Sequence, residues 1–314
     1  GILFAVLMII TFGFAYNSVQ SNTICLAWQK AFGIEPATMG IALTVLTLLI
    51  IFGGIHRVAK FSSTVVPVMA VVYLLIAVGV VVWNIASLPK VLLAIVENAF
   101  GFNQAAGGVL GVTVIQGIKR GLFSNEAGEG SAPNAAAVAT VSHPVKQGLI
   151  QALGVFTDTL VVCSCTAFII LVSGVDVTAS NGIQLTQDAL THEIGSIGNP
   201  FVAVMIWLFA FSSIIGNYYY GETNVRYIRD SKLGVFIYRL AVAAMVMVGA
   251  VVSLDFAWSF ADITMALLTL CNLVAIVLLS RQAVFLLQDY RQQKKEGKNP
   301  VFSKDKMPEI ADKL

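Results

Sequence analysis

The sequence has 314 residues, of which 57% are hydrophobic and only 11% are charged, and its formal net charge is +2. Charged residues make up about a quarter of an ordinary soluble domain, so this composition excludes one. The small net charge gives no reason to expect a nucleic-acid partner, and the position of the charges along the chain is more informative than their sum.

Apolar runs recur along the chain at about the 18 to 25 residues that a helix needs to cross a bilayer. We expect eight spans, at residues 2–24, 38–55, 65–83, 91–119, 145–172, 201–219, 233–253 and 261–280. The fourth of these spans is interrupted by glycines near residues 101–108. The predicted fold class is therefore an all-α polytopic membrane protein.

The basic residues are distributed unevenly between the two sides that these spans define. If the spans alternate in direction, 17 of the 19 Lys and Arg residues fall on one side, and only Lys30 and Lys90 fall on the other. An excess of Lys and Arg marks the cytoplasmic side of a membrane protein. Both ends of the chain are therefore predicted to be cytoplasmic.

Two parts of the chain are predicted from this pattern, a transmembrane domain at residues 1–288 and a cytoplasmic tail at residues 289–314. The tail is polar and mixed in charge, and it offers too little apolar surface to fold alone. We therefore expect a solvated segment rather than a domain. The four cysteines lie in or beside apolar runs and are predicted to be small core residues rather than a metal or disulfide site.

The stretch at residues 107–148 differs from the rest of the chain because it is glycine-dense and polar. Eight of the 26 glycines lie within residues 101–130. Broken helical backbone survives in a membrane protein only where it is buried in protein or lines a wet cavity, so a glycine-rich span can indicate a permeation site. Close packing of helices through small residues is the alternative, and spacing alone does not separate the two.

The literal sequence of this stretch carries more information. GLFSNEAGEGSAPNAAA at residues 121–137, followed by HPVKQG at 143–148, resembles the signature of the alanine or glycine:cation symporter family. Shorter matches are NSVQ at 17–20, FTDT at 156–159, FAFSS at 209–213 and YGE at 220–222. The resemblance extends over about residues 1–290.

The resemblance implies a five-plus-five inverted-repeat (leucine-transporter-like) fold and secondary active symport. The substrate would be alanine, glycine or a similar small amino acid, and the coupling ion would be sodium, with protons as the alternative. It also implies that additional amino-terminal spans precede this sequence, which would then be a fragment. A passive channel or a non-transporting membrane subunit of an assembly is the other class of function considered.

Several polar residues are candidates for substrate binding. Asn17 and Gln20 lie on one face of the first span and offer both donors and acceptors, although hydrogen bonding between helices would also explain them. The resemblance places Gln20 beside the substrate. Gly107 and Gly108 lie near the expected helix break, where free backbone N–H groups could bind a carboxylate. Asn217 stands where many family members have Trp, which implies a roomier or more polar pocket.

Ser212 and Ser213 are the candidate cation ligands, because the matching helix of the family's fold gives hydroxyl and carbonyl oxygens to a sodium ion. Adjacent serines can instead hydrogen-bond their own backbone and do nothing else. Asn125 and Glu126 are expected in an inner-gate network rather than as ligands. Asp158 lies in an apolar helix, where a carboxylate is costly, and either a neighbouring partner or a proton or cation relay would explain it.

No grouping of residues indicates enzymatic chemistry. The three histidines lie apart from one another near loops, and no Ser/His/Asp or Glu-x-x-His set occurs within a span. We expect no cofactor beyond the coupling sodium ion. The expected partners are a small amino acid, sodium and the lipid bilayer, without a nucleic acid or a soluble protein.

Overall fold

The computed structural model describes residues 1–53, 55–99, 107–303 and 305, with the backbone alone for residues 55–66, 99 and 107–113. All regular structure in these ranges is helical. The elements are α1 (Ile2–Met8), η1 (Ile9–Tyr16), α2 (Asn17–Phe32), α3 (Pro36–Ile51), α4 (Ile55–Trp83), α5 (Leu88–Ala99), α6 (Gly107–Asn125), α7 (Ala132–Ala136), α8 (Pro144–Thr157), η2 (Asp158–Cys163), α9 (Ser164–Ser173), α10 (Ile183–Ile194), η3 (Gly195–Ile197), α11 (Gly198–Ile228), α12 (Lys232–Val251) and α13 (Leu254–Lys295).

Within the described residues, five helical rods are long and apolar enough to cross a membrane: Ile2–Phe32, Pro144–Ser173, Ile183–Ile228, Lys232–Val251 and Leu254–Lys295. A sixth arises if Pro67–Trp83 and Leu88–Asn98, which meet at 102°, form one broken span. The structure thus confirms an all-helical chain with several membrane-capable helices. It does not by itself yield the eight spans predicted, because among the described residues Pro36–Ile51 is a shorter apolar helix, and Pro67–Trp83 and Leu88–Asn98 pass the length and composition test only as a bent pair.

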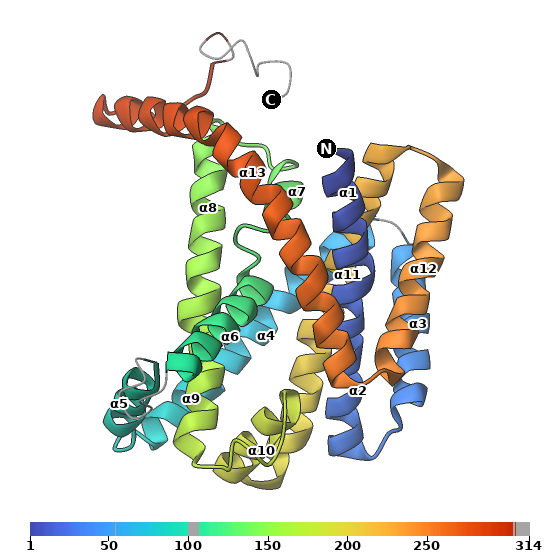
Figure 1. Cartoon of the computed structure of the whole chain (residues 1–314), viewed down its shortest axis with the longest axis vertical. Coiled ribbons are helices and arrows are strands. Elements are labelled where there is room, and N and C mark those ends of the chain that lie inside the picture. Colours follow the sequence, from blue (N-terminus) through green and yellow to red (C-terminus); the bar gives the residue numbers. More distant parts are fainter. Residues whose placement is uncertain (54, 100–106, 304, 306–314) are drawn as a thin grey trace.

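The rod formed by α1, η1 and α2 lies at the centre of the bundle, where α11, α12 and α13 pack around it (Figure 1). Polar side chains of α2 bind backbone carbonyls of α12: Ser21 Oγ donates to Val246 at 2.6 Å, and Asn22 Nδ2 donates to Gly249 at 3.1 Å. A Cβ added to Gly249 would lie 2.5 Å from the Cα of Ser18, so the two backbones nearly touch. Small residues and interhelical hydrogen bonds of this kind hold helices together in lipid.

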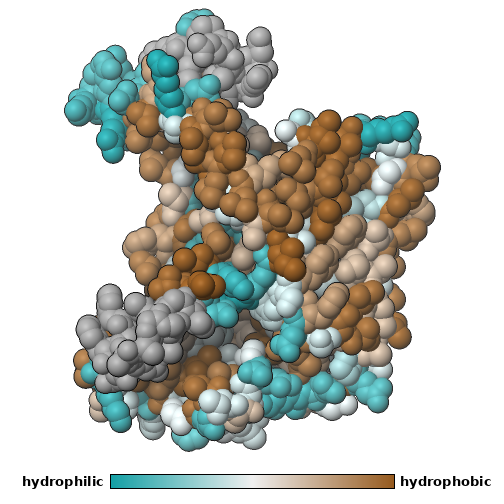
Figure 2. Space-filling view, in the orientation of Figure 1, coloured by the Kyte–Doolittle hydropathy of each residue, from teal (hydrophilic) through white to brown (hydrophobic). Residues whose placement is uncertain are grey.

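The outer face of the bundle is apolar. Leu153, Leu270 and Val277 are more than 60% exposed, as expected for residues that face lipid rather than water. Figure 2 shows hydrophobic residues over most of this face, with hydrophilic residues toward its two ends and in a smaller group nearer the middle. The distribution agrees with a multi-pass membrane protein.

The end of the chain differs from the solvated tail predicted. Helix α13 continues to Lys295, and it bends so that its last turns lie across the end of the bundle, on the same side as the amino terminus (Figure 1). The segment that follows contacts the start of α8: the Phe302 N–H donates to the Ser142 carbonyl at 2.8 Å, and Lys146 Nζ donates to Asn299 at 2.7 Å. The tail was predicted from composition, which does not register such docking.

Candidate functional site

The motif at residues 121–137 forms a helix break. Helix α6 ends at Asn125, and residues 126–131 follow without helical structure before α7 begins at Ala132. Within five residues, Glu126, Gly128 and Gly130 take φ values of 56°, 93° and 87°. Positive φ costs glycine little and other residues more, so Glu126 is held in this conformation by its surroundings. Helix α6 begins at Gly107, so Gly107 and Gly108 lie in its first turn, and the rest of the interruption expected near residues 101–108 lies outside the described residues.

The loop is fixed to the rest of the bundle by two long-range contacts. Asn272 of α13 donates from Nδ2 to the Gly128 carbonyl at 2.8 Å. A Cβ on Gly130 would lie 2.7 Å from Asn272 and 2.8 Å from the ring of Phe4, so only glycine fits there. Tyr16 of η1 donates to Glu129 Oε1 at 2.8 Å, and Glu129 is fully buried.

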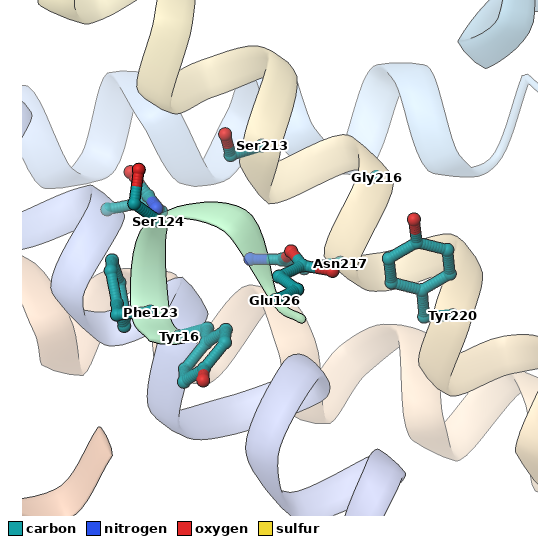
Figure 3. A pocket seen from close by; sticks show the side chains of 9 residues that line it. Tyr16, Phe123, Ser124, Glu126, Ser213, Gly216, Asn217 and Tyr220 are labelled. Atoms are coloured by element: carbon teal, nitrogen blue, oxygen red, sulfur yellow. The ribbon is translucent and has the colours of Figure 1, made fainter. Parts of the chain in front are cut away.

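A cavity of about 370 Å³ lies beside this loop (Figure 3). It lies between η1 and α2 on one side, α6 and its loop on another, and α11 on a third. Its lining residues are Tyr16, Gln20, Phe123, Ser124, Glu126, Ser213, Gly216, Asn217 and Tyr220. Three regions that are far apart in sequence thus supply polar side chains to one cavity of a size typical for small ligands.

Four of the residues predicted from sequence meet in this cavity, namely Gln20, Glu126, Ser213 and Asn217. Asn17 lies behind it, where its Oδ1 accepts from Asn217 Nδ2 at 3.2 Å and its own amide donates to the Gly13 carbonyl. Asn17 therefore orients Asn217 rather than lining the cavity. This contact also matches the interhelical hydrogen bonding considered as the alternative role of Asn17.

Both candidate cation ligands donate a hydrogen bond to the carbonyl of Phe209, Ser212 Oγ at 2.7 Å and Ser213 Oγ at 3.1 Å. The bonding to their own backbone that was considered as the alternative is therefore present. It does not exclude ligation, because a hydroxyl that donates its hydrogen keeps two acceptor lone pairs. Ser213 lines the cavity, whereas Ser212 does not belong to its lining.

The two residues at the end of α6 are held by the rod that contains α8. Asn125 Nδ2 donates to Thr159 Oγ1 at 2.9 Å, and Ser124 Oγ donates to Asp158 Oδ2 at 2.7 Å. Asn125, Glu126 and Asp158 line a second, larger cavity of about 760 Å³, which shares Ser124, Glu126 and Tyr220 with the first. The predicted gating residues thus lie next to the smaller cavity.

Glu126 accepts a hydrogen bond from Ser131 of its own loop. Its basic neighbours in sequence, Lys119 and Arg120, pair with Asp262 of α13, and Arg120 also lies over the ring of Trp258. Glu126 is thus hydrogen-bonded within its own loop, and the two basic residues pair with Asp262 rather than with Glu126.

Burial changes the pKa of the two carboxyl groups in this loop. Burial raises the pKa of Glu126 to about 6 and that of Glu129 to about 8, each with a smaller contribution from a nearby carboxylate. Both residues lie in the loop after α6, outside the helices long enough to span a bilayer. The described residues contain no cluster of three His, Cys, Asp or Glu side chains that could hold a metal ion, so a cation would depend on neutral oxygens and single carboxylates.

Five of the residues that line the cavity were not predicted from the sequence, although a sequence pattern points to each of them. Phe123 and Ser124 belong to the motif itself. Tyr16 lies four residues before Gln20 and so shares its helix face, while Gly216 and Tyr220 lie three and seven residues after Ser213. Extending each candidate residue along its helical stripe would have found them.

The sodium:alanine symporter family model matches residues 1–304. The chain belongs to this family. It is 54% identical over 97% of its length to the probable sodium/glutamine symporter GlnT of Bacillus subtilis, covering 64% of that protein. It is also 51% identical to the amino-acid carrier protein AlsT of Bacillus subtilis, over 98% of this chain and 66% of AlsT.

A more distant relative is the sodium/alanine symporter AgcS of Methanococcus maripaludis, 34% identical over 90% of this chain and 63% of AgcS. The chain thus spans slightly under two thirds of the length of these relatives. Members of the sodium:alanine symporter family are transporters rather than enzymes. The resemblance stated from the motifs is confirmed.

Proposed function

We propose that the complete protein is a secondary active symporter that takes up a small neutral amino acid together with sodium. The observation that carries this proposal is the 370 Å³ cavity, in which amide, hydroxyl and carboxylate groups from η1 and α2, the α6 loop and α11 converge. A zwitterion needs donors for its carboxylate and acceptors for its ammonium group. Gln20 and Asn217 offer the first, and Glu126 and the serines offer the second.

Sodium is the coupling ion in this proposal, with Ser213 and Ser212 among its ligands. The names of GlnT and AgcS both include sodium, which supports sodium as a coupling ion. A hard monovalent ion is bound by several oxygen atoms that replace its water shell. The remaining ligands would come from backbone carbonyls.

Alanine and glycine are the first substrates to test, and glutamine is the second candidate. Two observations favour testing glutamine. The amide of Asn217 lies in the cavity wall, and the relative GlnT is named as a probable sodium/glutamine symporter. The decisive experiment is counterflow in liposomes that contain the complete protein, with the amino acid and the cation varied independently. A symporter gives uptake that saturates with amino acid and requires sodium. A channel gives a current that does not saturate with amino acid, and a structural subunit gives no transport.

We further propose a five-plus-five inverted repeat and eight crossings, in an inner membrane with both ends of the chain cytoplasmic. The uneven distribution of basic residues supports this orientation, and the common side of the amino terminus and the end of α13 in Figure 1 is compatible with it. Reporter fusions after Arg57, Ile183 and Gln292 should score inside, outside and inside. An outside score at Gln292 would eliminate this topology.

A further inference from the structure

Asp158 begins a π-helical segment within the rod α8–η2–α9. A π turn adds one residue to the helix and changes which side chains face a neighbouring helix, and such segments are frequent at functional sites. Ser164 Oγ donates to the Thr159 carbonyl at 3.3 Å, five residues back, and so satisfies one carbonyl of the widened turn. A hydrogen bond from the residue that follows the π-helical segment therefore stabilises it.

The start of this π segment faces the end of α6 through two consecutive pairs. Ser124 Oγ donates to Asp158 Oδ2 at 2.7 Å, and Asn125 Nδ2 donates to Thr159 Oγ1 at 2.9 Å. Ser124 and Asn125 are the last two residues of α6 before its backbone turns to positive φ at Glu126. The two pairs thus hold the helix end where the broken loop begins.

The chemistry of the first pair fixes the direction of the Ser124 hydroxyl. Ser124 Oγ is the donor of this hydrogen bond, so its single hydroxyl hydrogen points to Asp158. The hydroxyl oxygen then has lone pairs left over. Cys163 Sγ lies 3.1 Å from this oxygen and 3.8 Å from Asp158 Oδ2, so its thiol can donate to either and takes up at most one lone pair of Ser124. Because Ser124 lines the 370 Å³ cavity, the remaining lone pair is an acceptor for a bound ligand.

We propose that Asp158 is a positioning residue, which holds the Ser124 hydroxyl as an acceptor for the ammonium group of the bound amino acid. This inference rests on the proposed transport function, and it chooses between the two roles that the sequence left open for Asp158. Asp158 lies outside the lining of the substrate cavity and touches the ligand only through Ser124. The hydrogen bond to Asp158 polarises the hydroxyl and strengthens it as an acceptor.

The test compares five variants of the complete protein in liposomes, using sodium-driven uptake of radiolabelled alanine, or of glutamine if that is the substrate. The variants are Asp158→Ala, Asp158→Asn, Ser124→Ala, the double variant Asp158→Ala with Ser124→Ala, and Thr157→Ala as the matched control. Thr157 is the residue before Asp158, is exposed, and donates only to the Leu153 carbonyl of its own helix. Thr157→Ala should retain wild-type kinetics.

Asp158→Ala should raise KM for the amino acid on the order of tenfold, with kcat and the sodium concentration for half-maximal uptake nearly unchanged, because only a ligand acceptor is misdirected. Asp158→Asn keeps an amide oxygen that can accept from Ser124, so it should stay within about threefold of wild type. Ser124→Ala should match Asp158→Ala, and the double variant should be no worse than either, because both remove the same interaction.

The inference is overturned if Asp158→Asn is as impaired as Asp158→Ala and loses the pH dependence of uptake, which would make Asp158 a proton relay. It is also overturned if the two alanine variants have additive effects, or if both keep the wild-type KM. If Asp158→Ala does not fold, Ser124→Ala with a raised KM and Asp158→Asn without one would support the inference, and any other combination would overturn it. Wild-type protein without sodium-dependent uptake would instead refute the proposed function.

Discussion

Tyr16 donates a hydrogen bond to Glu129 across a separation of 113 residues, with 2.8 Å between the Tyr16 oxygen and Glu129 Oε1. Tyr16 lines the cavity and Glu129 is fully buried behind it, so the bond joins the wall of the site to the loop that follows α6. The other carboxylate oxygen, Oε2, has no partner among the described residues. The loop therefore depends on Tyr16 for its attachment to η1.

Replacing Tyr16 by Phe should lower the stability of the protein, because it leaves a buried carboxyl without its hydrogen bond. We expect a loss of about 1–3 kcal/mol in the free energy of unfolding, measured by thermal unfolding in detergent. Tyr227→Phe is the control, since Tyr227 is 65% exposed, and it should change stability by less than about 0.5 kcal/mol. Equal stability of Tyr16→Phe and wild type would show that the bond contributes nothing.

Glu129 should also make stability depend on pH. Burial raises its pKa from 4.5 to about 8. A carboxyl whose pKa is higher in the folded than in the unfolded protein favours folding in its protonated form. Its contribution is therefore fully present below about 4.5 and is lost as pH rises through about 8.

The measurement is the unfolding temperature of the wild type and Glu129→Gln across that window of pH. The wild type should lose stability with rising pH, and Glu129→Gln should lose less, because the amide does not titrate. Glu35→Gln is the matched control at an exposed position and should follow the wild type. Parallel curves for the wild type and Glu129→Gln would show that Glu129 titrates normally.

The sequence predicted the region of the site but not its internal pairing. The glycine-rich stretch at residues 107–148 pointed to the region of the site, and the family resemblance pointed to Gln20 and Ser213, which line one cavity beside it. The break was expected near residues 101–108, so the helix break at residues 126–131 was not predicted. The pairing of Tyr16 with Glu129 could not be predicted, because no periodicity in the chain links two residues that far apart. The same holds for Asp262, which takes both Lys119 and Arg120 as partners.

The fold shows the same division between local and long-range information. Hydropathy predicted the apolar segments, since each apolar run forms helix over most of its described length. It placed a break between the predicted spans 65–83 and 91–119, and the turn at residues 84–87 lies in that break, but it did not predict that α4 and α5 meet at 102°. It also did not predict that residues 299–302 lie against the start of α8, since that contact uses backbone groups and Lys146 rather than apolar surface.

Gln20→Ala should weaken binding of the amino acid more than binding of sodium. Gln20 lines the cavity with an amide that can donate to a carboxylate, and the loss should be about 1–3 kcal/mol, or roughly 5- to 150-fold in affinity. The measurement is the concentration of each substrate that gives half-maximal uptake. Equal loss for both substrates, or loss of expression alone, would assign Gln20 to helix packing.

Ser213→Ala should raise the sodium concentration needed for half-maximal uptake. Ser213 Oγ gives its hydrogen to the Phe209 carbonyl, so towards the cavity it can act only as an acceptor, which suits a cation. Alanine is a better helix former than serine, so α11 should remain intact. By linkage, the apparent affinity for the amino acid should fall at limiting sodium and recover when sodium is saturating.

Thr44→Ala is the control for this substitution, because Thr44 donates to the Gly40 carbonyl of α3 in the same way and lies outside the cavity lining. It should leave the sodium dependence unchanged. Ser213→Cys adds a second readout, since a soft sulfur is a poor ligand for a hard cation and should resemble alanine. If Ser213→Ala keeps the wild-type sodium dependence in a well-expressed complete protein, sodium binds elsewhere, and the hydroxyl serves only to bond its own helix.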